Sequence, residues 1–112
     1  MAVARALIMR GEVHLVRLDP TRGSEIRKTR PCLVISPDEL NQHLRTVIVA
    51  PMTTGGHVYP WRIACRFQNR SGCVALDQLR TVDSERLVKR LGRLPVRTTG
   101  EVLETLQEMF AE

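Results

Sequence analysis

The hydrophobic positions of this chain come in short runs separated by turn-forming residues. The runs are rich in Val, Ile and Leu and are too short for helices, so they suit β-strands. Prolines and glycines bound several of them: Asp19-Pro20 ends the first run, and Gly55-Gly56 follows the third. The pattern predicts strands within residues 11–20, 31–37, 45–54, 57–67 and 73–79.

The end of the chain has a different period. Apolar side chains recur at helical spacing between Val102 and Phe110, which predicts an amphipathic helix over residues 98–112. Thr98, followed three residues later by Glu101, is typical of a capping box at the start of this helix. Its outer face is acidic, since four glutamates recur along it.

Two other segments are less regular. Residues 38–44 are polar and predict a turn or one short helical turn. Residues 82–95 fit either a helix capped by Asp83 or Ser84, or one helical turn that leads into a strand. Because no long helix separates the strands, the order of elements excludes a βαβ fold. We expect a mainly β protein with one packing helix (α+β), built as a small antiparallel barrel or curled sheet.

Composition narrows the class of protein. The 112 residues suit one domain, 1–112, with a formal net charge of +5. Of the seventeen basic residues, fifteen are arginines, which suit phosphate recognition, although a GC-rich genome gives the same bias. The three cysteines form no CxxC pair, which indicates reduced thiols in a cytoplasmic protein. No apolar run reaches the ~18 residues of a membrane span.

Most catalytic motifs are absent from the sequence. There is no phosphate-binding P-loop and no nucleophile elbow, and the three histidines stand far apart without a carboxylate cluster. We therefore expect no metal and no cofactor. The four aromatic residues are too few for a stacking sheet of the RNA-recognition-motif type.

The remaining chemistry is that of arginine, threonine and carboxylate. Such a set can cleave RNA, because the 2′-hydroxyl supplies the nucleophile and the protein supplies a base, an acid and charge stabilisation. Arg30 stands where the basic stretch GSEIRKTRP (23–31) meets a strand, and Thr53 and Thr54 end another strand. The alternative is that the arginine is solvated and the threonines are only strand formers.

Several motifs, in order and over essentially the whole chain, resemble one family. They are Arg10-Gly11-Glu12-Val13, Leu18-Asp19-Pro20, Gly23-Ser24-Glu25, Arg30-Pro31, the strand VIVAPMTT, and the Asp77-Gln78 pair within YPWRIACRFQNRSGCVALDQLRTVD. This pattern is similar to that of the MazF/PemK toxins, ribonucleases of type II toxin–antitoxin systems that share a fold with the gyrase poison CcdB.

The resemblance implies an SH3-like antiparallel barrel with a C-terminal helix, acting as a homodimer. It implies metal-independent cleavage of single-stranded RNA at a short sequence, giving a 2′,3′-cyclic phosphate and a 5′-hydroxyl. The family's catalytic arginine and threonine fall on Arg30 and Thr53, and Glu25 is the predicted carboxylate base or orienting group. We expect RNA contacts from Ser24, Arg27, Lys28, Thr54, Asp77, Gln78 and Arg80. The implied partner is an antitoxin with an acidic C-terminal segment.

The chain departs from this pattern at three positions. PemK-type enzymes have a histidine where this chain has Ser24, and an arginine where it has Ala75. Asp77 is retained, so the MazF-type pair of Arg30 and Thr53 is the better prediction. Ile26 stands where the family commonly has glutamine.

Two other functions remain open at this point. One is a CcdB-like gyrase poison, which needs neither Arg30 nor Thr53 and commonly ends in tryptophan, whereas this chain ends in Phe-Ala-Glu. The other is a non-catalytic RNA-binding barrel.

Overall fold

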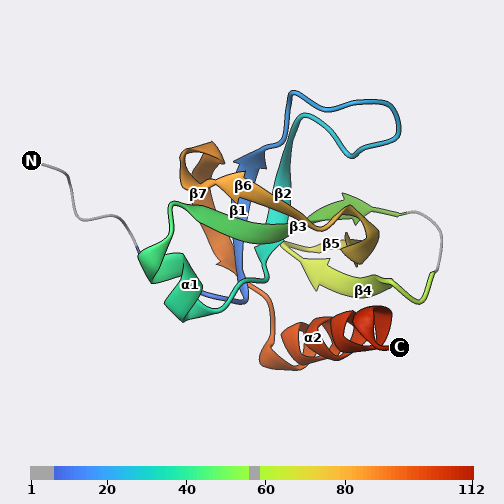
Figure 1. The fold of residues 1–112 in the computed structure, drawn as a ribbon. Helices are drawn as coiled ribbons and strands as arrows, with labels where there is room; N and C mark the ends of the chain where they lie inside the picture. Colours follow the sequence, from blue (N-terminus) through green and yellow to red (C-terminus); the bar gives the residue numbers. More distant parts are fainter. Residues whose placement is uncertain (1–6, 56–58) are drawn as a thin grey trace, which may run out of the picture.

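The protein is described by a computed structural model that covers residues 7–55 and 59–112 (Figure 1). It consists of one antiparallel sheet, with a long helix packed below it in the view of Figure 1. The elements are β1 (Glu12–Arg17), β2 (Thr29–Val34), α1 (Asp38–His43), β3 (Thr46–Thr54), β4 (Arg62–Phe67), β5 (Arg70–Ala75), η1 (Leu76–Gln78), β6 (Arg80–Asp83), η2 (Ser84–Arg86), β7 (Leu87–Arg93) and α2 (Val96–Phe110).

The strands run in the order β4-β5-β3-β2-β1-β7, and β6 pairs with β3 beside this path. The predicted class, an antiparallel sheet with a C-terminal helix, is confirmed. Among the described strands β4 and β7 are not paired with each other, so the sheet is curled and is not a closed barrel.

Two apolar clusters lie on opposite faces of the central strands, because successive strand residues point to opposite sides. Leu33 and Val74 belong to the first cluster, which α2 covers through Val102 and Leu106. The second cluster contains Cys32, Val34, Val49 and Val82, with Ile26 of the β1–β2 loop packed against it. The helix therefore protects one face, while β6 and the loop protect the other.

The end of β5 was predicted wrongly. Residues 73–79 do not form one strand, since β5 ends at Ala75 and residues 76–78 form the 3₁₀ turn η1. The short strand β6 was not predicted at all. It is held by its pairing with β3, in which Val82 lies opposite Val47.

The structure also tests three predictions about the later part of the chain. The predicted capping box is wrong, because α2 begins at Val96 after Pro95 and has no side-chain cap. For residues 82–95 the second alternative is confirmed: Asp83 accepts a hydrogen bond from the Glu85 amide, one helical turn follows, and β7 continues the chain. Of the strand predicted at 57–67, residues 57 and 58 lie outside the described residues, and β4 covers 62–67.

No helix in the described ranges is both long and apolar enough to cross a membrane.

Candidate active site

A cavity of about 590 Å³ opens where the end of β3 meets the start of β2 and the β4–β5 hairpin. Three of the predicted site residues with basic or hydroxyl side chains line it next to Arg30: Lys28, Thr53 and Thr54. The opposite wall comes from the hairpin. Its residues are Cys65, Phe67, Gln68, Arg70, Ser71 and Gly72. We call this cavity the cleavage groove, after the RNA cleavage that the sequence resemblance predicts.

The pairing of β2 with β3 explains why Arg30 and Thr53 meet. The last paired residues are Cys32 and Pro51. Arg30 and Thr53 each lie two residues beyond that pair, and residues two apart in a strand point to the same face. The two side chains thus leave the ends of neighbouring strands on one side of the sheet.

The loop itself orients Arg30. The Nε of Arg30 donates a hydrogen bond to the carbonyl oxygen of Arg27, at 3.1 Å. Within the described residues the two terminal nitrogens have no hydrogen-bond partner, so they can donate to a phosphate oxygen. A planar guanidinium suits this contact better than an ammonium does.

Thr53 is held from the neighbouring strand. Its hydroxyl lies 3.2 Å from the Cys73 sulfur, and either group can donate the hydrogen bond. The next pair of this ladder joins Thr54 and Gly72. A Cβ on Gly72 would lie 2.0 Å from the Thr53 carbonyl oxygen, so only glycine permits this close approach.

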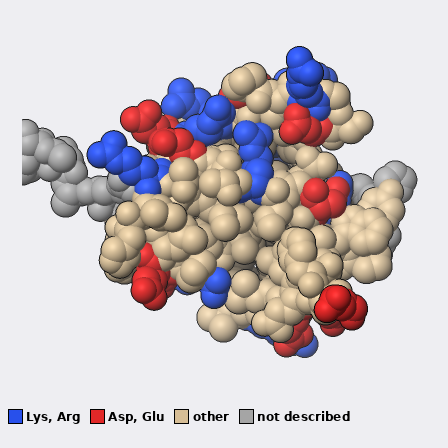
Figure 2. Space-filling view, viewed as in Figure 1, with Lys and Arg blue, Asp and Glu red and all other residues tan. Residues whose placement is uncertain are grey.

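The basic loop is tied to the rest of the fold at its base. The Leu18 amide donates to the Lys28 carbonyl at 2.9 Å. The Ile26 amide donates to the side-chain oxygen of Gln78 at 3.1 Å, and Arg80 donates to the Leu18 carbonyl at 3.1 Å. In Figure 2 basic atoms stand out at the top of this projecting loop, with acidic atoms beside them. Gln78 and Arg80, predicted to bind RNA, therefore also have a structural role in holding the loop.

Glu25 does not line the cleavage groove. Its carboxylate accepts a hydrogen bond from the Arg22 amide, which closes a tight turn within the loop. It lines a separate, smaller hollow of about 380 Å³, together with Asp77, Gln78 and Arg80. Ser24 and Arg27 are exposed on the loop and line neither hollow.

Asp77 is part of an ion pair that the sequence did not reveal. Both of its carboxylate oxygens accept hydrogen bonds from Arg62, each at 2.8 Å. These hydrogen bonds lower the pKa of Asp77 and raise that of Arg62. Arg62 is the cross-strand partner of Ala75, the position where PemK-type enzymes have arginine. The arginine beside Asp77 is therefore supplied by β4, and only the strand register could have indicated it.

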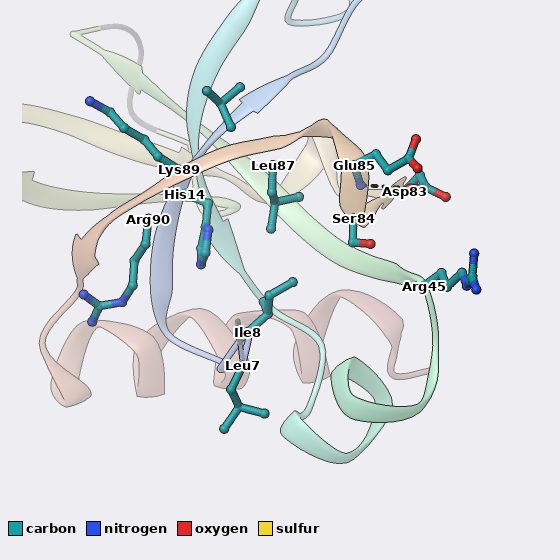
Figure 3. Close-up of a pocket in the computed structure, with 11 residues that line it drawn as sticks. Leu7, Ile8, His14, Arg45, Asp83, Ser84, Glu85, Leu87, Lys89 and Arg90 are labelled. Carbon is teal, nitrogen blue, oxygen red and sulfur yellow. Dashed lines mark hydrogen bonds between the residues drawn. The ribbon is translucent and has the colours of Figure 1, made fainter. Parts of the chain in front are cut away.

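A third hollow, of about 480 Å³, lies beside β1 and β7, at the end of the strand order opposite to β4 (Figure 3). His14, Leu87 and Arg90 line it, and none of the predicted site residues does. Beneath it Glu12 is buried between His14, at 3.1 Å, and Arg90, at 2.7 Å. Both oxygens of the Glu12 carboxylate have hydrogen-bond partners, and the cluster joins β1 to β7. We therefore assign it a structural role.

Burial keeps two of the three cysteine thiols protonated. Burial raises the pKa of the Cys32 thiol to about 12, and burial is also the main cause that raises the pKa of Cys65. Within residues 7–55 and 59–112, no three histidine, cysteine, aspartate or glutamate side chains come together as metal ligands would.

Comparison with known proteins identifies the family. Residues 9–110 match the model of the PemK-like, MazF-like toxins of type II toxin–antitoxin systems. The endoribonuclease PemK of Escherichia coli is 39% identical over 107 residues, which cover 90% of this chain and 80% of that protein. Endoribonuclease MazF9 of Mycobacterium tuberculosis is 32% identical over 111 residues, covering 90% of this chain and 94% of that protein.

A solved structure agrees with these sequence matches. The crystal structure of MazF from Deinococcus radiodurans superimposes with a TM-score of 0.82 at 26% identity, covering 92% of this chain and 96% of that one. The chain belongs to the PemK-like, MazF-like family of type II toxin–antitoxin toxins.

Proposed function

We propose that this toxin is an endoribonuclease that cuts single-stranded RNA at a short recognition sequence, without a metal ion, in the cleavage groove. The proposal rests on one observation: Arg30 and Thr53 line the same cavity in a chain that belongs to this toxin family. Both relatives at more than 30% identity are named endoribonucleases, which supports the same activity here.

The proposed reaction is an internal transesterification. The 2′-oxygen of the nucleotide before the cut attacks phosphorus and loses its proton to a base. The bond from phosphorus to the 5′-oxygen breaks, and that oxygen takes up a proton. The products are a 2′,3′-cyclic phosphate and a 5′-hydroxyl, so no external nucleophile is consumed.

The proposed roles follow from the chemistry of each side chain. Arg30 stabilises the negative charge that develops on the phosphoryl oxygens and donates a proton to the leaving oxygen. An arginine at its usual pKa is a poor base, so it is better suited to donation than to abstraction. The Thr53 hydroxyl donates to a nonbridging phosphate oxygen. Glu25 remains the predicted base or orienting group, and RNA binding would have to bring its loop toward the groove.

The other proposed contacts surround the groove and the loop. Lys28 and Thr54 line the groove, and Asp77, Gln78 and Arg80 line the adjacent hollow, which supports RNA contacts from these side chains. Ser24 and Arg27 are exposed on the loop and would contact RNA outside the groove. Positive charge on the loop favours the phosphate backbone whatever its sequence.

Membership of a toxin–antitoxin family supports a cognate antitoxin as partner. We propose that its acidic C-terminal segment competes with RNA for the basic loop and the groove, because both ligands are anionic. The single domain 1–112, the homodimer and the cytoplasmic location are part of the same proposal. Light scattering of the purified protein tests the dimer.

Mapping the ends of RNA fragments tests the activity. The purified protein is incubated in EDTA with a long single-stranded RNA, and the fragment ends are identified. Discrete cuts with 5′-hydroxyl and 2′,3′-cyclic phosphate ends are expected, and one 2′-deoxy sugar before a cut should abolish that cut. A folded protein that cleaves no RNA but inhibits gyrase would support the CcdB-like alternative instead.

A further inference from the structure

We propose that the stacked pair formed by Tyr59 and Trp61 is a subsite that binds a base of the RNA substrate beside the cleavage groove. The inference rests on the proposed RNA cleavage and adds a binding site to it. The two rings are almost parallel, with an angle of 3° between their planes and 5.2 Å between their centroids. Both remain at the surface, with exposed fractions of 39% and 38%.

The pair is held firmly in place. The Trp61 carbonyl accepts a hydrogen bond from the Leu76 amide at 3.0 Å, which ties this residue to the start of η1. The Arg62 guanidinium lies over the Tyr59 ring, 5.9 Å from its centroid, and is itself fixed by two hydrogen bonds to Asp77. The rings are thus oriented before any ligand arrives, and little conformational entropy is lost on binding.

A chain of contacts connects the pair to the cleavage groove. Thr53 pairs with Cys73 across β3 and β5, and Cys73 pairs with Ala64 across β5 and β4. Arg62 lies two residues before Ala64 and so points to the same face of the sheet. The Cys73 sulfur lies close enough to Arg62 to contribute, after Asp77, to raising the pKa of that arginine. Arg62 and Thr53 therefore lie along one face of the sheet, and the Tyr59 ring of the stacked pair contacts Arg62.

The chemistry of this surface favours a nucleic-acid base over a protein segment. Every base has a flat π face, and aromatic side chains that stack on bases are a general device for binding single strands. Within the described residues Trp61 stacks on Tyr59 alone, which leaves part of the indole accessible. The groove at the other end of this face carries Lys28, Arg30 and Arg70 for the phosphates.

Tryptophan fluorescence provides a direct test, because Trp61 is the only tryptophan of the chain. The probe is a short RNA containing the mapped cleavage sequence, with one 2′-deoxy sugar before the cut so that it is bound and not cleaved. We expect this RNA to quench the emission of the wild-type protein, with the same midpoint as the anisotropy of a labelled RNA.

Variants then separate stacking from other effects. Trp61→Ala should weaken RNA binding by about tenfold or more, the range that a lost base–aromatic stack gives. Trp61→Phe should retain most of the affinity, and kcat at saturating RNA should change much less than KM in both variants. Phe110→Ala is the matched control, since Phe110 is an aromatic residue at the end of α2 with an exposed fraction of 74%. Tyr59→Leu serves as a second probe if Trp61→Ala fails to fold.

The outcomes distinguish this inference from the proposed function. If the wild-type protein cleaves RNA while its emission is unchanged by the probe and Trp61→Ala binds normally, the subsite is wrong and the ribonuclease stands. The inference is also overturned if Trp61→Ala loses affinity only for an acidic peptide and not for RNA, since the surface would then bind protein. If wild type neither cleaves nor binds any RNA, the proposed function itself fails.

Discussion

Arg30 is positioned by its own loop. The contact from its Nε to the Arg27 carbonyl leaves the outer edge of the guanidinium for a ligand. Thr53 is likewise oriented by the Cys73 thiol before RNA arrives. In the proposed reaction both side chains would therefore already be oriented by their neighbours, which would lower the reorganisation needed in the transition state.

Glu12 gives a prediction about acid stability. Burial alone would raise its pKa, but hydrogen bonds from the Met9 amide, His14 and Arg90 lower it below the ordinary value of 4.5. A carboxyl with a lowered pKa stabilises the folded state above its unfolded pKa, and this contribution is lost as the pH falls through the folded pKa. Glu12→Gln should reduce the free energy of unfolding at pH 7 by about 2 kcal/mol, the value of a charged hydrogen bond.

Urea unfolding at several pH values tests this prediction. The difference between wild type and Glu12→Gln should shrink as the pH falls below about 4.5. Glu104→Gln, on the exposed side of α2, is the control and should change neither the stability at pH 7 nor its acid dependence. A constant difference between wild type and Glu12→Gln across the whole pH range would contradict the account.

At the scale of elements, the close approach of β3 and β5 fixes the position of Thr53. Gly72→Ala would place a Cβ against the Thr53 carbonyl, a backbone atom that cannot move alone. We expect a loss of stability of about 1–3 kcal/mol, as for other overpacked sites, together with reduced cleavage.

Gly100, inside α2, has no neighbour within 4 Å of an added Cβ. Gly100→Ala should therefore raise stability by up to about 1 kcal/mol. Thermal unfolding tests the loss of stability predicted for Gly72→Ala and the gain predicted for Gly100→Ala. A Gly72→Ala protein as stable as wild type would refute the packing argument.

The elements also show what the sequence can and cannot predict. The strand runs at 31–37 and 45–54 were recognisable because they are apolar, β-branched and bounded by turn residues. The run from Cys73 to Leu79 looked like a strand because Val74, Ala75 and Leu76 are all apolar, and the turn at 76–78 depends on contacts with Trp61 that no local pattern shows. β6 has four residues and exists through its pairing with β3.

The same limit applies to the candidate site. Arg30 and Thr53 could be predicted because each stands at the end of a recognisable strand and matches a family motif. The ion pair of Arg62 with Asp77 could not, since fifteen residues separate them and their meeting depends on the register of β4 and β5. The stacking of Tyr59 on Trp61 could not be predicted either, since it depends on the turn that the Arg62 amide closes with the Tyr59 carbonyl.

At the scale of the molecule, charge is distributed unevenly. The loop between β1 and β2 carries the exposed basic residues Arg27 and Lys28 where it leads into β2, whereas α2 carries acidic residues along its outer face. Figure 2 shows acidic atoms near the helix at the lower edge of the molecule. RNA should therefore approach the loop and the groove, away from the helix.

The salt dependence of RNA binding tests this distribution. For single strands the slope of log affinity against log salt is about −0.7 for each phosphate neutralised. Arg27→Ala and Lys28→Ala should each make the slope less steep by about 0.7. Arg97→Ala, in the first turn of α2, removes the same charge and should leave the slope unchanged. Equal effects of all three substitutions would mean that only net charge attracts the RNA.

The most direct test of the central claim is the rate of RNA cleavage by Arg30→Ala, measured in EDTA beside wild type and Arg97→Ala. The account predicts that wild type and Arg97→Ala cut at the same positions at similar rates, and that Arg30→Ala, folded as judged by circular dichroism, is slower by about 100-fold or more. Cleavage by Arg30→Ala at the wild-type rate would show that the reaction takes place without this arginine, and would contradict the assignment of the groove as the active site.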